Sequence, residues 1–202
     1  GTFCPLDGYA GPSEVLSGFA SGAKRAGVKI YEGVEVKGIS LARGMMRGIK
    51  IKDEEIAVPV VVNAAGPFAA SVGEMAGVKI PVKSLRRQIF VTAPFHLTDR
   101  PIPLTIDFHR GWYFRQEVDG FLLSGPLDLE SSFNTNIDYQ AMAETSENTM
   151  YRVPALENAR IARGWAGLYE ISPDNHAILG RVPGVEGLIL ANGFSGHGFQ
   201  HS

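Results

Sequence analysis

The sequence is poor in cysteine and in net charge, and it has no long apolar run. A single cysteine, Cys4, among 202 residues excludes an internal disulfide framework and favours a reducing, cytoplasmic location. A formal net charge of −2 gives no electrostatic footprint for nucleic acid or for an anionic membrane. No apolar run approaches the roughly 18 residues that a membrane-spanning helix needs, so we expect a soluble protein that binds neither membranes nor nucleic acid.

Two further patterns are absent. Outside the C-terminal glycine-rich stretch the histidines are scattered and have no cysteine partner, so we expect no metal site. No strand followed by G-x-G-x-x-G and a helix occurs in the sequence, although that pattern holds the pyrophosphate of dinucleotides. The chain also begins at Gly1 rather than at methionine, which favours a fragment of a longer protein.

The first third of the chain alternates between helical and strand patterns. After Pro12, apolar residues recur at helical spacing from Val15 to Ala26 and predict a helix with one buried face that stops at Gly27. Short apolar runs then predict strands over residues 28–31, 34–39, 45–51 and 58–62. This order is typical of the late part of a doubly wound nucleotide-binding lobe with a small antiparallel insert.

From Lys79 onward the pattern changes to short apolar runs separated by Pro and Gly turns. These runs predict strands over residues 82–92, 104–108, 112–115, 121–124, 159–169 and 177–179. Such strands are typical of a largely antiparallel sheet. Asp138 suits an N-cap and predicts a helix over 138–150. The fold class is therefore α/β of the α+β kind, with part of a doubly wound lobe and a second lobe built on an antiparallel sheet.

Two loops that follow apolar strands are candidate ligand sites. The strand at 188–191 runs into Gly193, Gly196 and Gly198, and the strand at 58–62 runs into residues 63–66 (Asn-Ala-Ala-Gly). Small residues let a backbone turn at positive φ and lie close to a ligand. A glycine-rich turn and tight strand–helix packing explain the same patterns equally well, and the G-x-x-G-x-G spacing is not the dinucleotide fingerprint.

Both loops resemble flavin-contacting segments of the FAD-dependent amine oxidoreductases, the group of sarcosine and dimethylglycine dehydrogenases, sarcosine oxidase and glycine oxidase. The resemblance rests on residues 192–199 (Asn-Gly-Phe-Ser-Gly-His-Gly-Phe) and 60–68 (Val-Val-Val-Asn-Ala-Ala-Gly-Pro-Phe), with Phe68 where the family usually carries tryptophan. Residues 165–170 and 173–180 also look like the dehydrogenase branch. Because both main segments occur in the expected order, the resemblance covers essentially the whole chain.

The resemblance implies FAD as the cofactor and assigns a lobe to each ligand. Residues 15–78 and 173–202 would form a partial FAD-binding lobe, and residues 1–14 and 79–172 a substrate-binding lobe. Attachment would be non-covalent in this region, because Gly167 stands where relatives carry the linking cysteine. Lacking the upstream pyrophosphate segment, the fragment alone is expected not to retain FAD. The implied cofactor-binding residues are Val36, Ala64, Ala65, Gly66, Gly193, Phe194, Ser195, Gly196, His197, Gly198, Phe199 and Gln200.

In the family that the chain resembles, the antiparallel sheet covers the flavin and lines the substrate pocket, so the resemblance implies Tyr113 and Arg115 as the candidate substrate-binding residues. They alternate onto one face of their strand, and an arginine there could bind a carboxylate through two hydrogen bonds. The alternative is an arginine paired with Glu117 or Asp119. Arg86 and Arg87 are interpreted as a solvated strand face. Gln200 takes the place of a lysine that binds the substrate carboxylate in sarcosine oxidase-like members, so carboxylate recognition is weaker or lies elsewhere.

The resemblance implies oxidation of a secondary or tertiary amine, such as sarcosine or dimethylglycine, by hydride transfer to the flavin. No acid–base catalytic side chain is identified. Leu123 matches a lysine that oxygen-using relatives place above the flavin, which favours a dehydrogenase. The alternatives are a non-catalytic fragment, a subunit of a hetero-oligomer that needs a partner segment, and an oxidoreductase for a D-amino acid, glycine or an opine.

Overall fold

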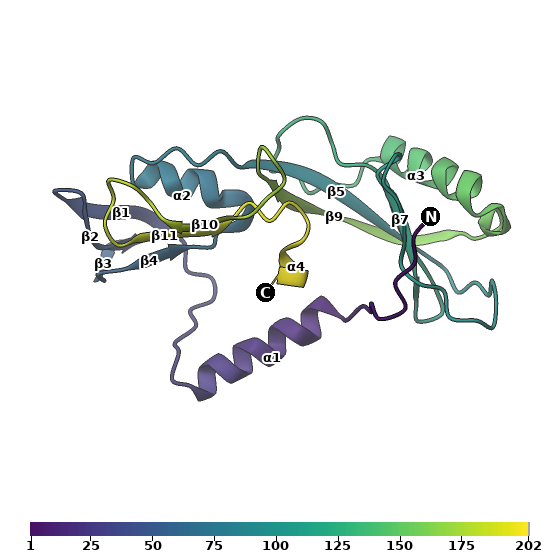
Figure 1. The fold of residues 1–202 in the computed structure, drawn as a ribbon, viewed down its shortest axis with the longest axis horizontal. Helices are drawn as coiled ribbons and strands as arrows, with labels where there is room; N and C mark the ends of the chain where they lie inside the picture. Colours follow the sequence, from purple (N-terminus) through teal and green to yellow (C-terminus); the bar gives the residue numbers. More distant parts are fainter. Residues whose placement is uncertain (202) are drawn as a thin grey trace. The chain divides into compact units, whose positions relative to one another are not determined.

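The computed structural model describes residues 1–201, and the chain in it divides into two compact units. The first unit contains Gly1–Val82 and the segment from Ser172 onward, and the second contains Lys83–Ile171 (Figure 1). Ser202, which ends the predicted FAD-binding lobe, lies outside the described residues. The chain therefore enters the second unit once and returns to the first.

The unit boundaries fall close to those of the predicted lobes, with one difference. Residues 1–14, which were predicted to belong with the antiparallel-sheet lobe, fall in the first unit. They lead directly into helix α1 (Pro12–Arg25) of that unit. The assignment of FAD to one lobe and of substrate to the other remains a prediction.

The α/β character of the first unit comes from a three-stranded sheet with the order β10-β11-β4. Its strands are β10 (Ile178–Arg181), β11 (Leu188–Asn192) and β4 (Val61–Asn63). β11 pairs parallel with β4 and antiparallel with β10. The second sheet of this unit contains β1 (Val36–Ala42), β2 (Met45–Ile51) and β3 (Glu54–Ala57).

Helix α2 (Ala69–Met75) follows β4 through a short 3-10 turn, η1 (Gly66–Phe68), and completes the core of this unit. Leu188 of β11 is 1% exposed and packs with Met46 and Ile39 of the second sheet. The Cβ that a side chain would add at Gly73 of α2 would lie 2.7 Å from Ile80, so only glycine allows this close helix packing.

Three predictions for the first unit are wrong. Residues 28–31 form no strand, and Val28, Ile30 and Tyr31 are exposed. Helix α1 forms and stops at Gly27, which has φ 88°, but it has no buried residue. The predicted strand over 58–62 shortens to β4, because Pro59 has no N–H to donate to a sheet. Apolar spacing alone therefore did not show whether these segments have a partner.

The second unit is built on an antiparallel sheet, as predicted, and its five strands have the order β6-β7-β8-β5-β9, which the sequence did not predict. Its strands are β5 (Lys83–Thr92), β6 (Thr105–Asp107), β7 (Trp112–Glu117), β8 (Gly120–Ser124) and β9 (Ile161–Ile171). Helix α3 (Tyr139–Arg152) packs against this sheet, and the carboxylate of its N-cap, Asp138, accepts a hydrogen bond from Gln140 N at 2.8 Å. Figure 1 shows β5 and β9 running side by side as the longest pair.

The two faces of this sheet differ in character. The face toward α3 carries the apolar core, in which Trp112, Phe114 and Leu123 pack with the 3-10 turn η2 (Pro154–Leu156). Trp112 donates a hydrogen bond from Nε1 to Thr149 Oγ1 of α3 at 2.9 Å. Because side chains alternate along a strand, Tyr113 and Arg115 lie on the other face. None of the described helices is long and apolar enough to cross a membrane.

Candidate functional site

The two loops singled out in the sequence follow neighbouring parallel strands. β4 and β11 pair in register, with Leu190 beside Asn63, and both strands run out at the same edge of the sheet. Residues 64–66 follow β4 there, and residues 193–198 follow β11. In open α/β sheets, ligands bind outside the carboxyl ends of parallel strands. The fold thus brings together two segments that are about 130 residues apart in sequence.

Two buried asparagines join the strand ends. Asn63 donates from Nδ2 to Ala69 O at 2.9 Å and accepts a hydrogen bond from Ala65 N at 3.2 Å. Asn192 donates from Nδ2 to Asn63 O at 3.2 Å. The Asn192 side chain is 0% exposed, yet its Oδ1 has no hydrogen-bond donor among the described residues. A buried acceptor without a donor is costly, so a group outside the described residues would be stabilised there.

The glycine-rich loop has a backbone that few other residues adopt. Gly193 and Gly196 have φ angles of 73° and 92°, and Ser195 between them has φ 54°. A Cβ at Gly193 would lie 3.1 Å from the Ser172 Cβ, so packing within the unit already requires this glycine. Among the described residues, the backbone N–H groups of Ser195 and Gly196 have no acceptor. The loop therefore has a fixed shape and two backbone N–H groups that are available to a ligand.

The loop after β4 offers a similar backbone. Gly66 has φ 54°, and a Cβ added there would meet nothing within 4 Å, so this position borders open space. Ala64 is exposed and Ala65 is half-buried. The residues therefore leave the carboxyl edge of β4 accessible to a ligand.

Ser195 also anchors the glycine-rich loop to the segment after β9, which the sequence did not reveal. Its Oγ accepts a hydrogen bond from Ser172 N at 3.1 Å, lies 3.2 Å from Ser172 Oγ and donates to Gly193 O at 3.1 Å. Ser172 in turn donates from Oγ to His176 O at 2.7 Å. A hydrogen bond from His176 N lowers the pKa of Asp174 in the same turn. The turn that packs against the loop is therefore itself fixed.

The remaining predicted cofactor residues lie toward the end of the chain or in the other sheet. Gly198, Phe199 and Gln200 belong to the short helix α4 (Gly198–His201), and Phe194 precedes it. His197 is exposed, and its ring stacks on His201 at 6.2 Å between centroids. Val36 begins β1 and is half-buried, so strand pairing does not place it beside Asn63 and Asn192.

In the second unit, the two predicted substrate residues have different environments. Arg115 Nη2 lies 2.8 Å from Glu117 Oε2, so its charge is already paired, as in the alternative interpretation. Tyr113 is half-buried, and the guanidinium carbon of Arg87 lies 4.8 Å from the centroid of its ring. Strand pairing brings Tyr113 and Arg115 onto the same face as Ser124 and Leu122 of β8.

The interpretation of Arg86 and Arg87 as a solvated strand face is wrong. Arg86 donates from Nε to Asp128 Oδ2 and from Nη1 to Asn136 O, both at 2.8 Å. Arg87 donates from Nε to Ser124 Oγ at 3.0 Å and from Nη2 to Gly111 O at 2.7 Å. Adjacent residues of a strand point to opposite faces, so the two arginines serve different surroundings.

Tyr169 completes a cluster around Arg87. Its ring centroid lies 5.6 Å from the Arg87 guanidinium carbon. Burial raises the pKa of Tyr169, and the neighbouring Tyr113 raises it further, against the opposing effect of Arg87. Arg87, Tyr113 and Tyr169 come from three separate strands, so no local pattern in the sequence could have revealed this cluster. It forms only through strand pairing.

The inference drawn from Leu123 also changes. Leu123 is 3% exposed and lies in the core beneath α3, on the face opposite Tyr113. The neighbours that share the face of Tyr113 are Leu122 and Ser124, which are uncharged, but Arg87 supplies a cation on that face. The absence of a lysine at Leu123 therefore does not indicate a site without positive charge.

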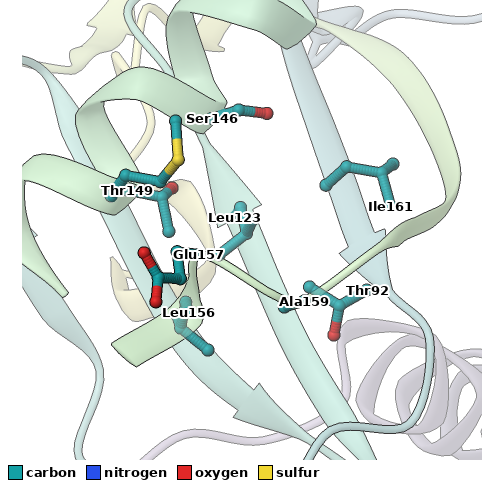
Figure 2. Close-up of a pocket in the computed structure, with 9 residues that line it drawn as sticks. Thr92, Leu123, Ser146, Thr149, Leu156, Glu157, Ala159 and Ile161 are labelled. Carbon is teal, nitrogen blue, oxygen red and sulfur yellow. The ribbon is translucent and has the colours of Figure 1, made fainter. Parts of the chain in front are cut away.

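The second unit also has a cavity of about 90 Å³ beside α3. It is lined by Thr92, Leu123, Ser146, Thr149, Met150, Leu156, Glu157, Ala159 and Ile161. Figure 2 shows Ser146 and Thr149 reaching it from the helix, with Leu123 below them on a strand. Because small-molecule sites usually occupy several hundred cubic ångströms, this space is too small for an organic substrate. Within residues 1–201 no cluster of His, Cys, Asp and Glu could hold a metal ion.

Comparison with protein families gives a match over residues 1–202 to the model described as FAD dependent oxidoreductase. Human mitochondrial sarcosine dehydrogenase is 28% identical over 213 residues, which cover 98% of this chain and 23% of that protein. Sarcosine oxidase subunit beta of Rhizobium meliloti is 29% identical over 191 residues, which cover 92% of this chain and 44% of that protein. The chain thus spans less than half the length of the curated relatives it matches.

The crystal structure of L-proline dehydrogenase from P. horikoshii resembles this chain in three dimensions. The two superpose with a TM-score of 0.86 at 32% sequence identity, over 96% of this chain and 53% of that one. The similarity therefore includes nearly all of the strands and helices described above.

Proposed function

The chain belongs to the family of FAD dependent oxidoreductases, and we propose that it is part of an enzyme that oxidises a secondary or tertiary amine, an N-substituted amino acid. The observation that carries this proposal is the pair of small-residue loops at the carboxyl ends of β4 and β11. The names of the relatives support the substrate class, because sarcosine and L-proline both carry a secondary amine beside a carboxylate.

The residues at these strand ends suit a flavin. Ser195 and Gly196 offer backbone N–H donors, Gly66 leaves open space for close approach, and Asn192 Oδ1 is a buried acceptor that lacks a donor. When bound, FAD accepts a hydride from the carbon next to the substrate nitrogen. The two N–H groups would then stabilise negative charge on the cofactor, and the rigid loop makes this possible without rearrangement.

The other predicted cofactor residues remain part of this proposal. Ala64 and Ala65 would keep the β4 loop free of bulky side chains, and residues 197–200 would continue the backbone surface of the glycine-rich loop. We also propose that this region holds FAD without a covalent bond, because the single cysteine, Cys4, is exposed in the N-terminal segment and Gly167 has no side chain. After acid precipitation and proteolysis of the holoenzyme, no peptide from residues 1–202 should carry flavin.

The experiment that tests the function follows the flavin spectrum of the full-length protein without oxygen. We expect N-methylglycine, N,N-dimethylglycine or L-proline to bleach the visible flavin band, and glycine and D-alanine to leave it unchanged. Bleaching by D-alanine or glycine alone would instead identify the alternative substrate class. Gly196→Val should prevent flavin binding or reduction, because a branched side chain disfavours φ 92°. No reduction by any secondary or tertiary amine would contradict the proposal.

We propose in addition that the enzyme works within a hetero-oligomer. The support is that one relative is, by its name, a subunit of sarcosine oxidase. Light scattering on the protein purified from its natural source should give a mass above that of its own chain, with a second polypeptide at a fixed ratio. A homogeneous, active single polypeptide would exclude this assembly.

A further inference from the structure

Arg87 is a half-buried cation for which the described residues supply no carboxylate. Its hydrogen bonds go to the Ser124 hydroxyl and to the Gly111 carbonyl, which are both neutral acceptors. Two nearby arginines differ: Arg86 pairs with Asp128 and Asp138, and Arg115 pairs with Glu117. Because a buried charge is costly without a counter-charge, the surroundings of Arg87 favour an anionic ligand.

The guanidinium of Arg87 is held in place and still has donors to offer. Arginine carries five N–H donors, of which Nε–H and one Nη2–H are used within the unit. Nη1 has no acceptor among the described residues. The Nη1–Nη2 end can therefore give two parallel hydrogen bonds to the two oxygens of one carboxylate, the geometry in which arginine binds anions best.

Open space lies next to this cation. Arg87 pairs directly with Gly167 across the β5–β9 ladder, so the two residues share one face of the sheet. A Cβ added at Gly167 would meet nothing within 4 Å. Tyr169 and Trp165 flank Gly167 on the same face, because residues two apart in a strand point the same way. The open space at Gly167 is therefore bordered by a cation and by aromatic rings.

We propose that Arg87, fixed by Ser124 and Gly111 and flanked by Tyr113 and Tyr169, binds the carboxylate of the amino-acid substrate. The proposal rests on the proposed function for the identity of the ligand as an amino acid. It transfers to Arg87 the role that the sequence predicted for Arg115, whose charge Glu117 neutralises. It also explains how the protein can bind a carboxylate although Gln200 stands where sarcosine oxidase-like relatives carry a lysine.

A binding experiment on the full-length protein tests the residue without requiring turnover. The probes are 2-furoate and its uncharged amide, 2-furamide, and affinity is measured by titration calorimetry. A charged hydrogen-bonded pair is worth about 1.5–3 kcal/mol, so Arg87→Gln should weaken 2-furoate about 10- to 100-fold and leave 2-furamide within about twofold. Arg87→Lys keeps the charge but cannot donate two parallel hydrogen bonds to one carboxylate, so it should weaken the affinity for 2-furoate by a smaller factor.

Two control variants separate Arg87 from other arginines. Arg163→Gln removes an exposed charge from the same sheet face and should leave both affinities unchanged. Arg115→Gln should also leave 2-furoate binding within about twofold of the wild type. The proposal is overturned if Arg115→Gln weakens 2-furoate as much as Arg87→Gln does, if Arg87→Gln weakens both probes equally, or if it weakens neither.

A turnover experiment distinguishes the failure of this proposal from the failure of the proposed function. In the wild type, N-methylglycine should have a lower KM than N-methylglycinamide, and Arg87→Gln should remove that preference without a matching change in kcat. If the wild type oxidises neither amine, the proposed function fails while the calorimetry still decides whether Arg87 binds carboxylates. If it oxidises both and Arg87→Gln keeps the preference for the acid, only the role of Arg87 is refuted.

Discussion

The two candidate sites are built from different parts of the polypeptide. In the first unit, the groups available to a ligand are the backbone N–H donors of Ser195 and Gly196, and Gly66 leaves open space for close approach. In the second unit they belong to side chains, with Arg87 and Tyr169 contributed by separate strands. A backbone site of this kind requires glycines at closely spaced positions, here Gly193 and Gly196, and so leaves a short motif in the sequence. A side-chain site assembled by strand pairing leaves none.

The side chains of the second site are held by the antiparallel sheet. Removing a core residue that packs on this sheet should therefore lower the free energy of unfolding more than any other change considered below. Trp112 is 1% exposed, packs on Phe114 with ring centroids 5.2 Å apart and donates a hydrogen bond to Thr149. Trp112→Ala should lower the free energy of unfolding by about 3–5 kcal/mol in urea titrations. Trp165→Ala, at a position that is 43% exposed, is the control and should cost far less. Equal losses of unfolding free energy in Trp112→Ala and Trp165→Ala would show that packing on the buried face does not stabilise this sheet.

Each of the two candidate sites contains a glycine, and the two glycines are expected to differ in how much stability a substitution costs. Gly193 has φ 73° and packs tightly, whereas Gly167 has open space where its Cβ would be. Gly193→Ala should therefore cost about 1–3 kcal/mol of unfolding free energy, and Gly167→Ala close to nothing. Thermal unfolding of both variants measures the difference. A Gly167→Ala variant as unstable as Gly193→Ala would refute this distinction.

A smaller effect is expected where a side chain fixes the backbone site. Ser195→Ala removes the acceptor of the buried Ser172 N–H, so it should destabilise the protein by about 1–2 kcal/mol. Ser146→Ala is a suitable control, because Ser146 only donates to Met142 O one turn earlier in α3. Denaturant titrations of the two variants would contradict the anchoring role of Ser195 if both lost the same stability.

The smallest effect concerns pH and the cluster around Arg87. Burial raises the pKa of Tyr169 above its ordinary value of 10.0, so the folded state holds this proton more tightly than the unfolded state does. The stability from this effect is fully present below pH 10.0 and is lost as pH rises through the higher folded-state pKa. Tyr169→Phe should flatten the decline of unfolding free energy above that pH. If the unfolding free energy of Tyr169→Phe declines with pH as steeply as that of the wild type, a group other than Tyr169 causes the loss of stability at alkaline pH.

The regular elements of the second unit were predictable because alternation along each strand is a local property. The Asp138 N-cap and the approximate positions of the strands between residues 82 and 171 followed from turn residues and periodicity, but their order in the sheet did not. The predictions failed where a partner decides the outcome. Val28 and Ile30 have the composition of a strand but are exposed, and α1 has an apolar face with no buried residue. Periodicity identifies an apolar face but not what covers it.

The same reasoning explains which candidate site residues the sequence could suggest. The motif around Gly193 and Gly196 identified the first loop, since those positions need glycine whatever else the chain does. For the second unit the sequence left open whether Arg115 binds substrate or pairs with Glu117, and it dismissed Arg87, because a sequence does not decide which arginine a carboxylate pairs with. Which carboxylate pairs with which arginine is decided by how the strands of the sheet pair.

The central claim, that the backbone of the glycine-rich loop binds the cofactor, is tested most directly by amide hydrogen exchange. The full-length protein is compared with and without FAD, and exchange is followed in peptides covering residues 64–66 and 193–198. The account predicts that FAD slows exchange at Ser195 and Gly196, whose N–H groups have no acceptor among the described residues, and not in the β1–β2 turn at Arg43 and Gly44. Unchanged exchange at residues 193–198 in a protein that has bound FAD would contradict it.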